Sequence, residues 1–256
     1  MSLRLTFGGS PNPAEWSMFS DIVTDLANEL IMNKDWTASH LRCPWQSQAP
    51  EPKTEPDDVP MMPARPLAVV PSTTTTAKVD VFIDDLIAVI LGTPENLQRV
   101  PHAVPLAMFL TSRSHAGDSE PLPRRTVLSI PKHLVEGAPA EIQIVLGWLI
   151  NCRRFLIALP KDKFDEWSKH LCQLLHHRGE TNFGNLETLV GRLNHAAAII
   201  PLSRHFLNRL QGRVKTRVSK LTRIQLTEEE LEDVKLWKTF LQRAHGGMSI
   251  DKVVVL

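Results

Sequence analysis

The sequence predicts an α+β fold on three observations. Val79–Ile90 is a β-branched and aromatic run of strand character that carries two adjacent acids, Asp84 and Asp85. A second hairpin signal covers Ile142–Leu159. Around both, apolar residues recur at helical spacing, so helices are expected before and after each pair of strands. The chain has 256 residues, 43% hydrophobic and 22% charged, enough for one good core or two modest ones.

Composition excludes several classes of protein. No apolar run approaches the length of a membrane span, and the first residues lack the pattern of a signal peptide. Cys43, Cys152 and Cys172 are too few and too scattered for a disulfide framework. We therefore expect an intracellular protein, in the cytoplasm or the nucleus, with no membrane partner.

The first expected element is an amphipathic helix from Pro13 to Asn33. Asn12 can cap it, Pro13 suits its first position, and Glu15 completes a capping box. Its apolar face comprises Trp16, Phe19, Ile22, Val23, Leu26 and Leu30. Prolines, clustered acids and a threonine tract then fill residues 42–77, which predicts a flexible insertion.

Two interpretations of the acidic pair remain open on the residues alone. Adjacent carboxylates in an apolar segment are costly to bury unless they are paired, lie at a turn or hold a metal. A plain hairpin would have Asp84-Asp85 at its tip. Alternatively, the two carboxylates form a site for a divalent cation, since Mg²⁺ prefers oxygen ligands.

Between the two hairpins the sequence predicts a helix beginning at Thr93-Pro94, which Pro101 and Pro105 should kink or split. A short strand, Thr126–Ile130, is expected next, followed by Lys132, for which a surface lysine is the simplest interpretation.

The second hairpin is expected to pair Ile142–Ile150 with Phe155–Leu159 through a turn at residues 151–154. Helical spacing and caps mark the segments that follow, and the chain ends on a strand-like Val253–Val255. The expected helices are Phe164–Gly179, Leu186–Ala197, Arg204–Leu210 and Thr227–Gly246. A capping box at residues 227–230 should open the last of them, and Gly246-Gly247 should end it.

The stretch from Thr188 to Thr227 holds eight Lys or Arg and no Asp or Glu. At the chain's average of 28 acids in 256 residues, about four would be expected there. A solvated charged face is one interpretation, and a surface that neutralises phosphates is the other. The candidate backbone-binding residues are Arg192, Arg204, Arg209, Arg213, Lys215, Arg217, Lys220 and Arg223.

Three short motifs carry a resemblance to reverse transcriptases. Phe82-Ile83-Asp84-Asp85 resembles their Tyr-x-Asp-Asp motif, and Phe7-Gly8 with Pro13 and Trp16 resembles the motif that precedes it. Leu146-Gly147-Trp148 resembles the primer grip, although a structural hairpin with a Gly that relieves crowding explains it as well.

The segment from Gly191 to Leu210 is similar to the thumb of gypsy/DIRS-like retroelements. The resemblance implies a partial polymerase palm of antiparallel strands and helices, followed by a helical thumb. The implied segments are palm 1–41, insertion 42–77, palm 78–160, thumb 161–225 and connection 226–256.

The resemblance also implies RNA-directed DNA polymerase chemistry, a nucleotidyl transfer with two Mg²⁺ ions, or Mn²⁺, on a template–primer duplex and a dNTP. Asp84 would be the primary metal ligand and Asp85 a secondary one, with Phe82 under the primer end. Phe7, Gly8 and Pro13 would flank the nucleotide and template. Lys132 would protonate the leaving pyrophosphate, and Leu146, Gly147 and Trp148 would hold the primer.

One part of the family pattern is missing. Reverse transcriptases need a further aspartate on a strand before the Phe7-Gly8 turn, and the six residues there contain no acid. Asp21 and Asp25 lie on the predicted helix and do not replace it. We therefore expect a retroelement polymerase fragment that is inactive alone, continuous in a larger polyprotein with upstream fingers and a downstream ribonuclease H domain. The alternatives are a non-catalytic nucleic-acid-binding module and a chain that is not made or does not fold.

Overall fold

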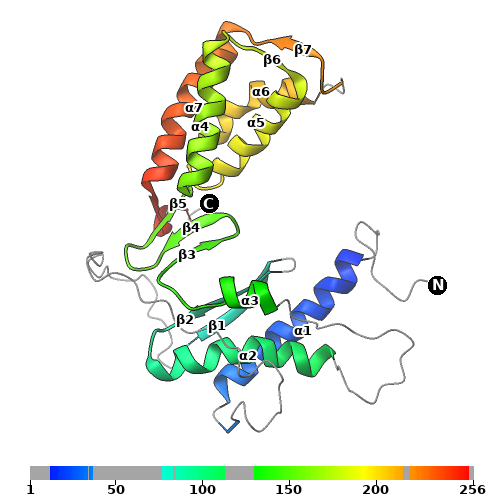
Figure 1. The fold of residues 1–256 in the computed structure, drawn as a ribbon, viewed down its shortest axis with the longest axis vertical. Coiled ribbons are helices and arrows are strands. Elements are labelled where there is room, and N and C mark those ends of the chain that lie inside the picture. The colour runs from blue at the N-terminus through cyan, green and yellow to red at the C-terminus, as the bar shows by residue number, and fades with distance from the viewer. Residues whose placement is uncertain are drawn as a thin grey trace, which may run out of the picture. The chain divides into compact units, whose positions relative to one another are not determined.

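The computed structural model describes residues 12–33, 35–36, 77–82, 85–112, 130–215 and 219–253. They form two compact units, an N-terminal unit up to Ala140 and a C-terminal unit from Glu141 onward (Figure 1). Helices combine with small antiparallel sheets, which confirms the predicted α+β class. The predicted segment 78–160 contributes to both units, and the predicted insertion 42–77 lies outside the described residues except for Ala77.

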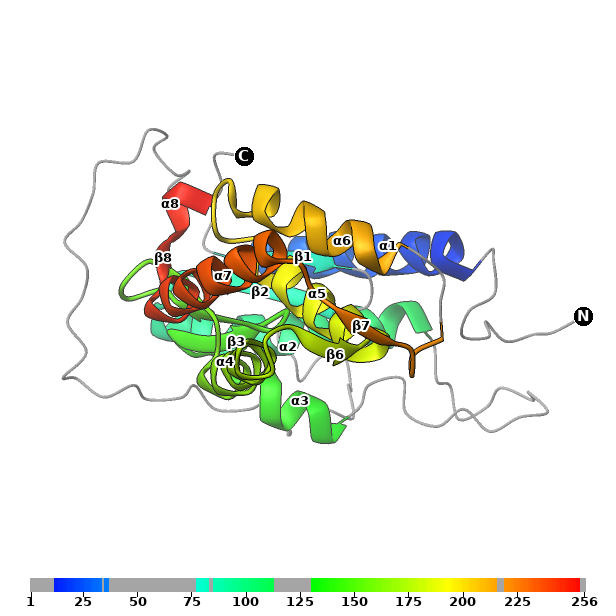
Figure 2. The same cartoon turned by 90° about the horizontal axis from the view of Figure 1, so that it is seen from above.

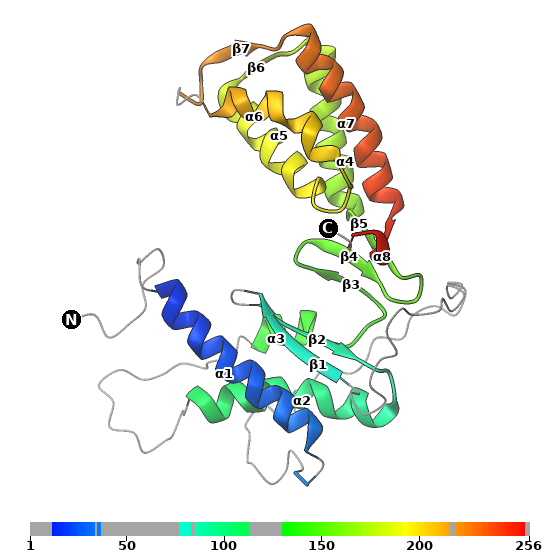
Figure 3. The same cartoon turned by 180° about the vertical axis from the view of Figure 1, so that it is seen from behind.

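The N-terminal unit packs a two-stranded sheet against two helices, as Figure 3 shows. Its strands are antiparallel, with Ala77 opposite Ile90 and Phe82 opposite Asp85. The elements are α1 (Asn12–Met32), β1 (Ala77–Phe82), β2 (Asp85–Ile90), α2 (Pro94–Ser112) and α3 (Ile130–Glu136). The helix predicted at residues 13–33 is confirmed in α1. Ile130 opens a helix, so it does not end a strand as predicted.

The core of this unit joins α1, β1 and α2. Val23 and Ala27 of α1 are buried with Val79 of β1 and Val100 of α2. The Asn28 side chain also ties helix to strand, because its Nδ2 donates to the Val79 carbonyl and its Oδ1 accepts from the Val79 amide, both at 2.9 Å. The sheet therefore has one face fixed against helices.

Of the two predicted effects of its internal prolines, a kink or a split, helix α2 does not show the split, because it continues from Pro94 to Ser112. Pro101 and Pro105 are four residues apart and both buried. A proline lacks the amide hydrogen that would bond to the carbonyl four residues earlier. Burial of the α2 apolar face against α1 offsets the lost hydrogen bonds, because tertiary packing supplies most of a helix's stability.

The C-terminal unit begins with a four-stranded antiparallel sheet in the order β3-β4-β5-β8. The strands are β3 (Ile142–Val145), β4 (Trp148–Asn151), β5 (Leu156–Ala158) and β8 (Met248–Ser249). The single strand predicted over Ile142–Ile150 is therefore wrong. It is a hairpin of its own, with Val145 opposite Trp148 and Leu146-Gly147 as its two-residue turn.

Helices and a short ribbon complete this unit. The ribbon strands β6 and β7 lie side by side near the start of α5, as Figure 2 also shows. The elements are α4 (Lys161–His176), β6 (Glu180–Asn182), α5 (Phe183–Ala196), the 3₁₀ helix η3 (Ser203–Leu207), α6 (Asn208–Val214), β7 (Arg223–Gln225), α7 (Glu228–Gly246) and α8 (Ile250–Val253). Val253 ends a helix, so it does not begin a strand as predicted.

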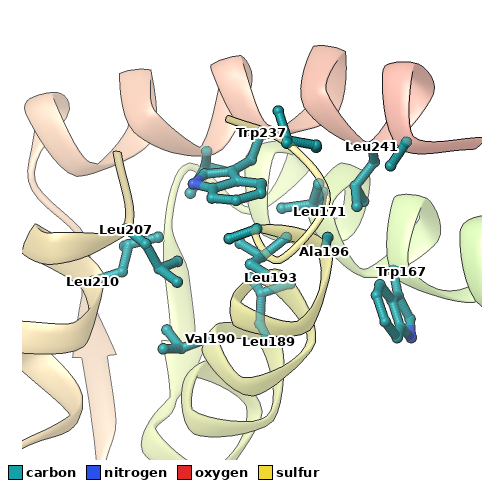
Figure 4. Close-up of a cluster of buried hydrophobic side chains, with 14 of the residues drawn as sticks. Trp167, Leu171, Leu189, Val190, Leu193, Ala196, Leu207, Leu210, Trp237 and Leu241 are labelled. Atoms are coloured by element: carbon teal, nitrogen blue, oxygen red, sulfur yellow. The ribbon is translucent and has the colours of Figure 1, made fainter. Parts of the chain in front are cut away.

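The core of the C-terminal unit lies between α4, α5, α6 and α7, whose apolar side chains point toward one another in Figure 4. Trp237 of α7 is fully buried at its centre, and its indole Nε1 donates to the Phe206 carbonyl at 3.0 Å. The predicted capping box is confirmed, because Thr227 and Glu230 bond reciprocally at the start of α7. Gly247, at a φ of +90°, follows the end of that helix.

Candidate nucleic-acid interface

Of the two predicted metal ligands, the structure describes Asp85, which lies in the β1–β2 hairpin, here called the acidic hairpin. Asp85 is the first residue of β2 and lies directly opposite Phe82, so Asp85 is paired in a strand and does not lie at the hairpin tip as predicted. The Phe82 ring is 54% exposed. Phe7, Gly8 and Asp84 lie outside the described residues, and Pro13 lies in the first turn of α1.

Lys132 of α3 is the nearest partner of Asp85. Its Nζ donates to Asp85 Oδ1 at 3.0 Å, and it lies 3.8 Å from Glu136, one turn further along α3. Both side chains of the Lys132–Asp85 pair remain open to water, at 56% and 42% exposure. The lysine predicted from the resemblance is therefore beside the acidic hairpin.

The described residues do not make a complete magnesium site. Asp85 is the described member of the predicted pair of ligands, and an ammonium group already neutralises its carboxylate. Within the described ranges, no group of three His, Cys, Asp or Glu side chains could hold a metal ion. The two-metal site stays a prediction.

The Leu146-Gly147 turn is the second predicted element, and it belongs to the C-terminal unit. Both residues have positive φ, +50° for Leu146 and +78° for Gly147, as a type I′ turn requires. Leucine disfavours this conformation, so its presence is an outlier of the kind that clusters at functional sites. Leu146 is 40% exposed at the tip.

Two side chains from the helices hold this turn in place. Lys163 of α4 donates from Nζ to the Gly147 carbonyl at 3.0 Å. His195 of α5 stacks on Trp148, with ring centroids 4.2 Å apart and planes 5° from parallel, and Trp167 meets it edge-on. Burial and the nearby Lys163 ammonium lower the pKa of His195, while the Gly147 carbonyl opposes the shift. The stack therefore involves a neutral imidazole at pH 7.

Several cations of the predicted basic block already form ion pairs within the fold. Arg209 lies 3.2 Å from Asp233 and 3.5 Å from Glu229, and Arg213 donates from Nε to Glu230 Oε1 at 2.8 Å. Glu230 and Asp233 side chains are only 7% and 9% exposed. The expectation that this block lacks compensating acids is therefore wrong in three dimensions, because α7 supplies them from beyond Thr227.

The other described cations of the block pair with acids whose side chains are about half exposed or more, or form no ion pair. Arg192 pairs with Glu166, Lys220 lies 3.8 Å from Glu187, and Arg223 lies 3.9 Å from Glu180. Arg204 and Lys215 form no ion pair with the described residues, and Arg217 lies outside them. Only part of the predicted surface is thus committed to the fold.

An open groove of about 800 Å³ runs between α4, the β6–β7 ribbon and α5. We call it the α4–α5 groove, and its polar walls include Lys169, His170, Asn182, Asn185, Arg192 and Arg223. Sequence reasoning missed Lys169 and His170, which precede the basic block. Lining residues recur at positions 166, 169, 170, 173 and 177 of the sequence, a helical spacing that could have marked one polar face.

No known family model, curated protein or solved structure matches this chain. The resemblance to reverse transcriptases therefore depends on the short motifs alone. In the part of the chain that the structure describes, no helix has the length and apolar character needed to cross a membrane.

Proposed function

We propose that this chain is a reverse-transcriptase-like fragment that binds a template–primer duplex and does not polymerise nucleotides by itself. The observation that carries the proposal is the register of the acidic hairpin, which sets Phe82 directly opposite Asp85. Directly opposed residues on paired antiparallel strands lie on the same face of the sheet. An aromatic ring and a carboxylate are thus neighbours on one face of the sheet, at the ends of β1 and β2.

The C-terminal unit supports the binding part of the proposal. It joins a turn with an exposed, left-handed Leu146 to a helical lobe whose surface carries Arg204, Lys215 and the α4–α5 groove. Cations on such a surface neutralise phosphates and release counterions, which gives affinity without sequence readout. An intracellular location, in the cytoplasm or the nucleus, goes with this proposal.

The proposed lack of polymerase activity follows from the carboxylates available to bind magnesium. Two magnesium ions need several carboxylates to clamp them, and among the described residues Asp85 is the one predicted ligand, with no group of three metal-binding side chains around it. The Lys132 ammonium on Asp85 also competes with any cation for that carboxylate. The proposed role is therefore to position a nucleic acid and not to join nucleotides.

Two assays on the whole chain test the proposal. In fluorescence anisotropy, a labelled template–primer duplex should bind at low salt and be released as salt rises, with a linear fall of log K against log salt. Primer extension with Mg²⁺ or Mn²⁺ should give no template-dependent product. Asp85→Asn should leave duplex affinity unchanged if the chain is a non-catalytic module. Affinity that ignores salt, or a template-directed product, would each refute the corresponding half of the proposal.

A further inference from the structure

The α4–α5 groove carries a net positive charge. Lys169, Arg192 and Arg223 face two carboxylates, those of Glu166 and Glu180. Lys169 forms no ion pair with any residue that the structure describes. Three cations and two anions leave an excess of one positive charge.

The carboxylates in the groove can give way to another anion at little cost. Glu166 and Glu180 side chains are 60% and 63% exposed, and the Arg223 side chain is 87% exposed. Ion pairs this open to water contribute only about 0–1 kcal/mol. A phosphate that enters the groove can therefore replace a glutamate as the partner of an arginine, and its geometry suits two parallel hydrogen bonds from a guanidinium.

His170 adds a neutral donor to these cations. Arg192 Nη1 donates to His170 Nδ1 at 3.4 Å, so Nδ1 carries no proton and Nε2 carries the hydrogen. Burial lowers the pKa of His170, and the Arg192 charge lowers it further against the opposing effect of Glu166. With the amide groups of Asn182 and Asn185, the groove offers charged and neutral donors along one wall.

The groove offers unpaired bases no aromatic surface, because none of its lining residues is Phe, Tyr or Trp. From these features we propose that the α4–α5 groove binds the phosphodiester backbone of a nucleic acid, through contacts that carry no sequence information. This inference rests on the proposed nucleic-acid binding and assigns that binding to Lys169, Arg192 and Arg223.

Charge variants of the whole chain test this assignment by anisotropy with two 20-base-pair duplexes of unlike sequence. Lys169→Ala and Arg223→Ala should each weaken both duplexes by about fivefold at low salt, the equivalent of one exposed ion pair. Each should also reduce the slope of log K against log salt by about 0.9, one phosphate contact. Glu180→Gln should strengthen binding, which a merely structural role would not do.

The matched control is Lys161→Ala, which removes one cation from the same helix outside the groove, where Lys161 pairs with Asp165 at 2.9 Å. If Lys169→Ala and Arg223→Ala change affinity no more than this control, the groove assignment fails while the proposed function stands. If the wild-type chain binds neither duplex at low salt, both fail. Competition by inorganic pyrophosphate at micromolar concentration would also overturn the assignment, because it would mark a site for a small phosphate.

Discussion

Two clusters of ion pairs in the C-terminal unit use the same residue types in opposite ways. At the α6–α7 junction, Arg209 and Arg213 meet Asp233 and Glu230, whose side chains are almost fully buried. In the α4–α5 groove, arginines meet glutamates that are more than half exposed. All of these arginines come from one basic stretch of sequence. The difference lies in the acidic partner, which comes from outside this stretch. An arginine whose acid is buried stabilises the fold, whereas an arginine whose acid is exposed can bind a ligand instead.

The largest effect should come from breaking the junction. Arg213→Ala leaves the Glu230 carboxylate buried with hydrogen bonds from Thr227 but no cation, so the free energy of unfolding should fall by about 2 kcal/mol. The loss stays below that of a fully buried pair because Arg213 is 45% exposed. Urea denaturation followed by circular dichroism measures it.

A second variant separates lost charge from lost packing at this junction. Arg213→Ala with Glu230→Gln keeps the reciprocal cap, since glutamine also serves at that position, and removes the uncompensated charge. The double variant should be more stable than Arg213→Ala alone. If Arg213→Ala changes the unfolding free energy by less than about 0.5 kcal/mol, the junction is no different from a surface pair.

A smaller effect should appear in acid. Burial alone would raise the pKa of Glu230, but hydrogen bonds from Arg213 and Thr227 outweigh it and lower the pKa. Because the folded-state pKa lies below the ordinary 4.5, ionised Glu230 stabilises the fold above that pH. The contribution is lost as the pH falls through the folded-state pKa. Unfolding free energies from pH 7 to pH 3 should fall less steeply for Glu230→Gln, and equal slopes would contradict this.

The exposed pairs should have the smallest effect on stability. Arg223→Ala in the groove and Lys132→Ala beside the acidic hairpin should each change the unfolding free energy by less than about 0.5 kcal/mol, because water screens both pairs. Thermal unfolding of the two variants beside the wild type measures this. A large loss in either would place that lysine or arginine with the structural cations of the junction.

Helical spacing, caps and glycines correctly predicted elements whose ends depend on residues close together in the sequence. The helix at residues 13–33, the Thr227 capping box and the glycine end of α7 are present as expected. The prediction of one strand over Ile142–Ile150 failed at Leu146. This residue adopts a left-handed conformation in a turn, which its side chain disfavours. An apolar run through such a turn is indistinguishable from one long strand. Likewise, the prolines of α2 predicted a kink or a split, and packing against α1 keeps the helix from being split.

The candidate site was only partly predictable for a different reason. The sequence marked the cations and the Leu146-Gly147-Trp148 motif, but not which cations the fold commits. Arg209 and Arg213 find their acids about twenty residues further along the chain, whereas Arg192 reaches back to Glu166. The stacking of His195 on Trp148 joins residues 47 positions apart and has no local signature. Such pairings depend on how helices pack, which spacing alone does not reveal.

The closing strand of the C-terminal unit has a consequence for how the unit is made. Strand β8 pairs with β5, and the Ile250 amide donates to the Phe155 carbonyl at 3.1 Å, so the sheet that starts at Ile142 is finished by Met248. During translation, more than a hundred residues emerge between the start of this sheet at Ile142 and the strand β8 that pairs with the free edge of β5. Until β8 has been made, the backbone hydrogen-bonding groups of β5 on that side have no strand partner. A chaperone or a second nascent chain can then compete with β8 for this edge.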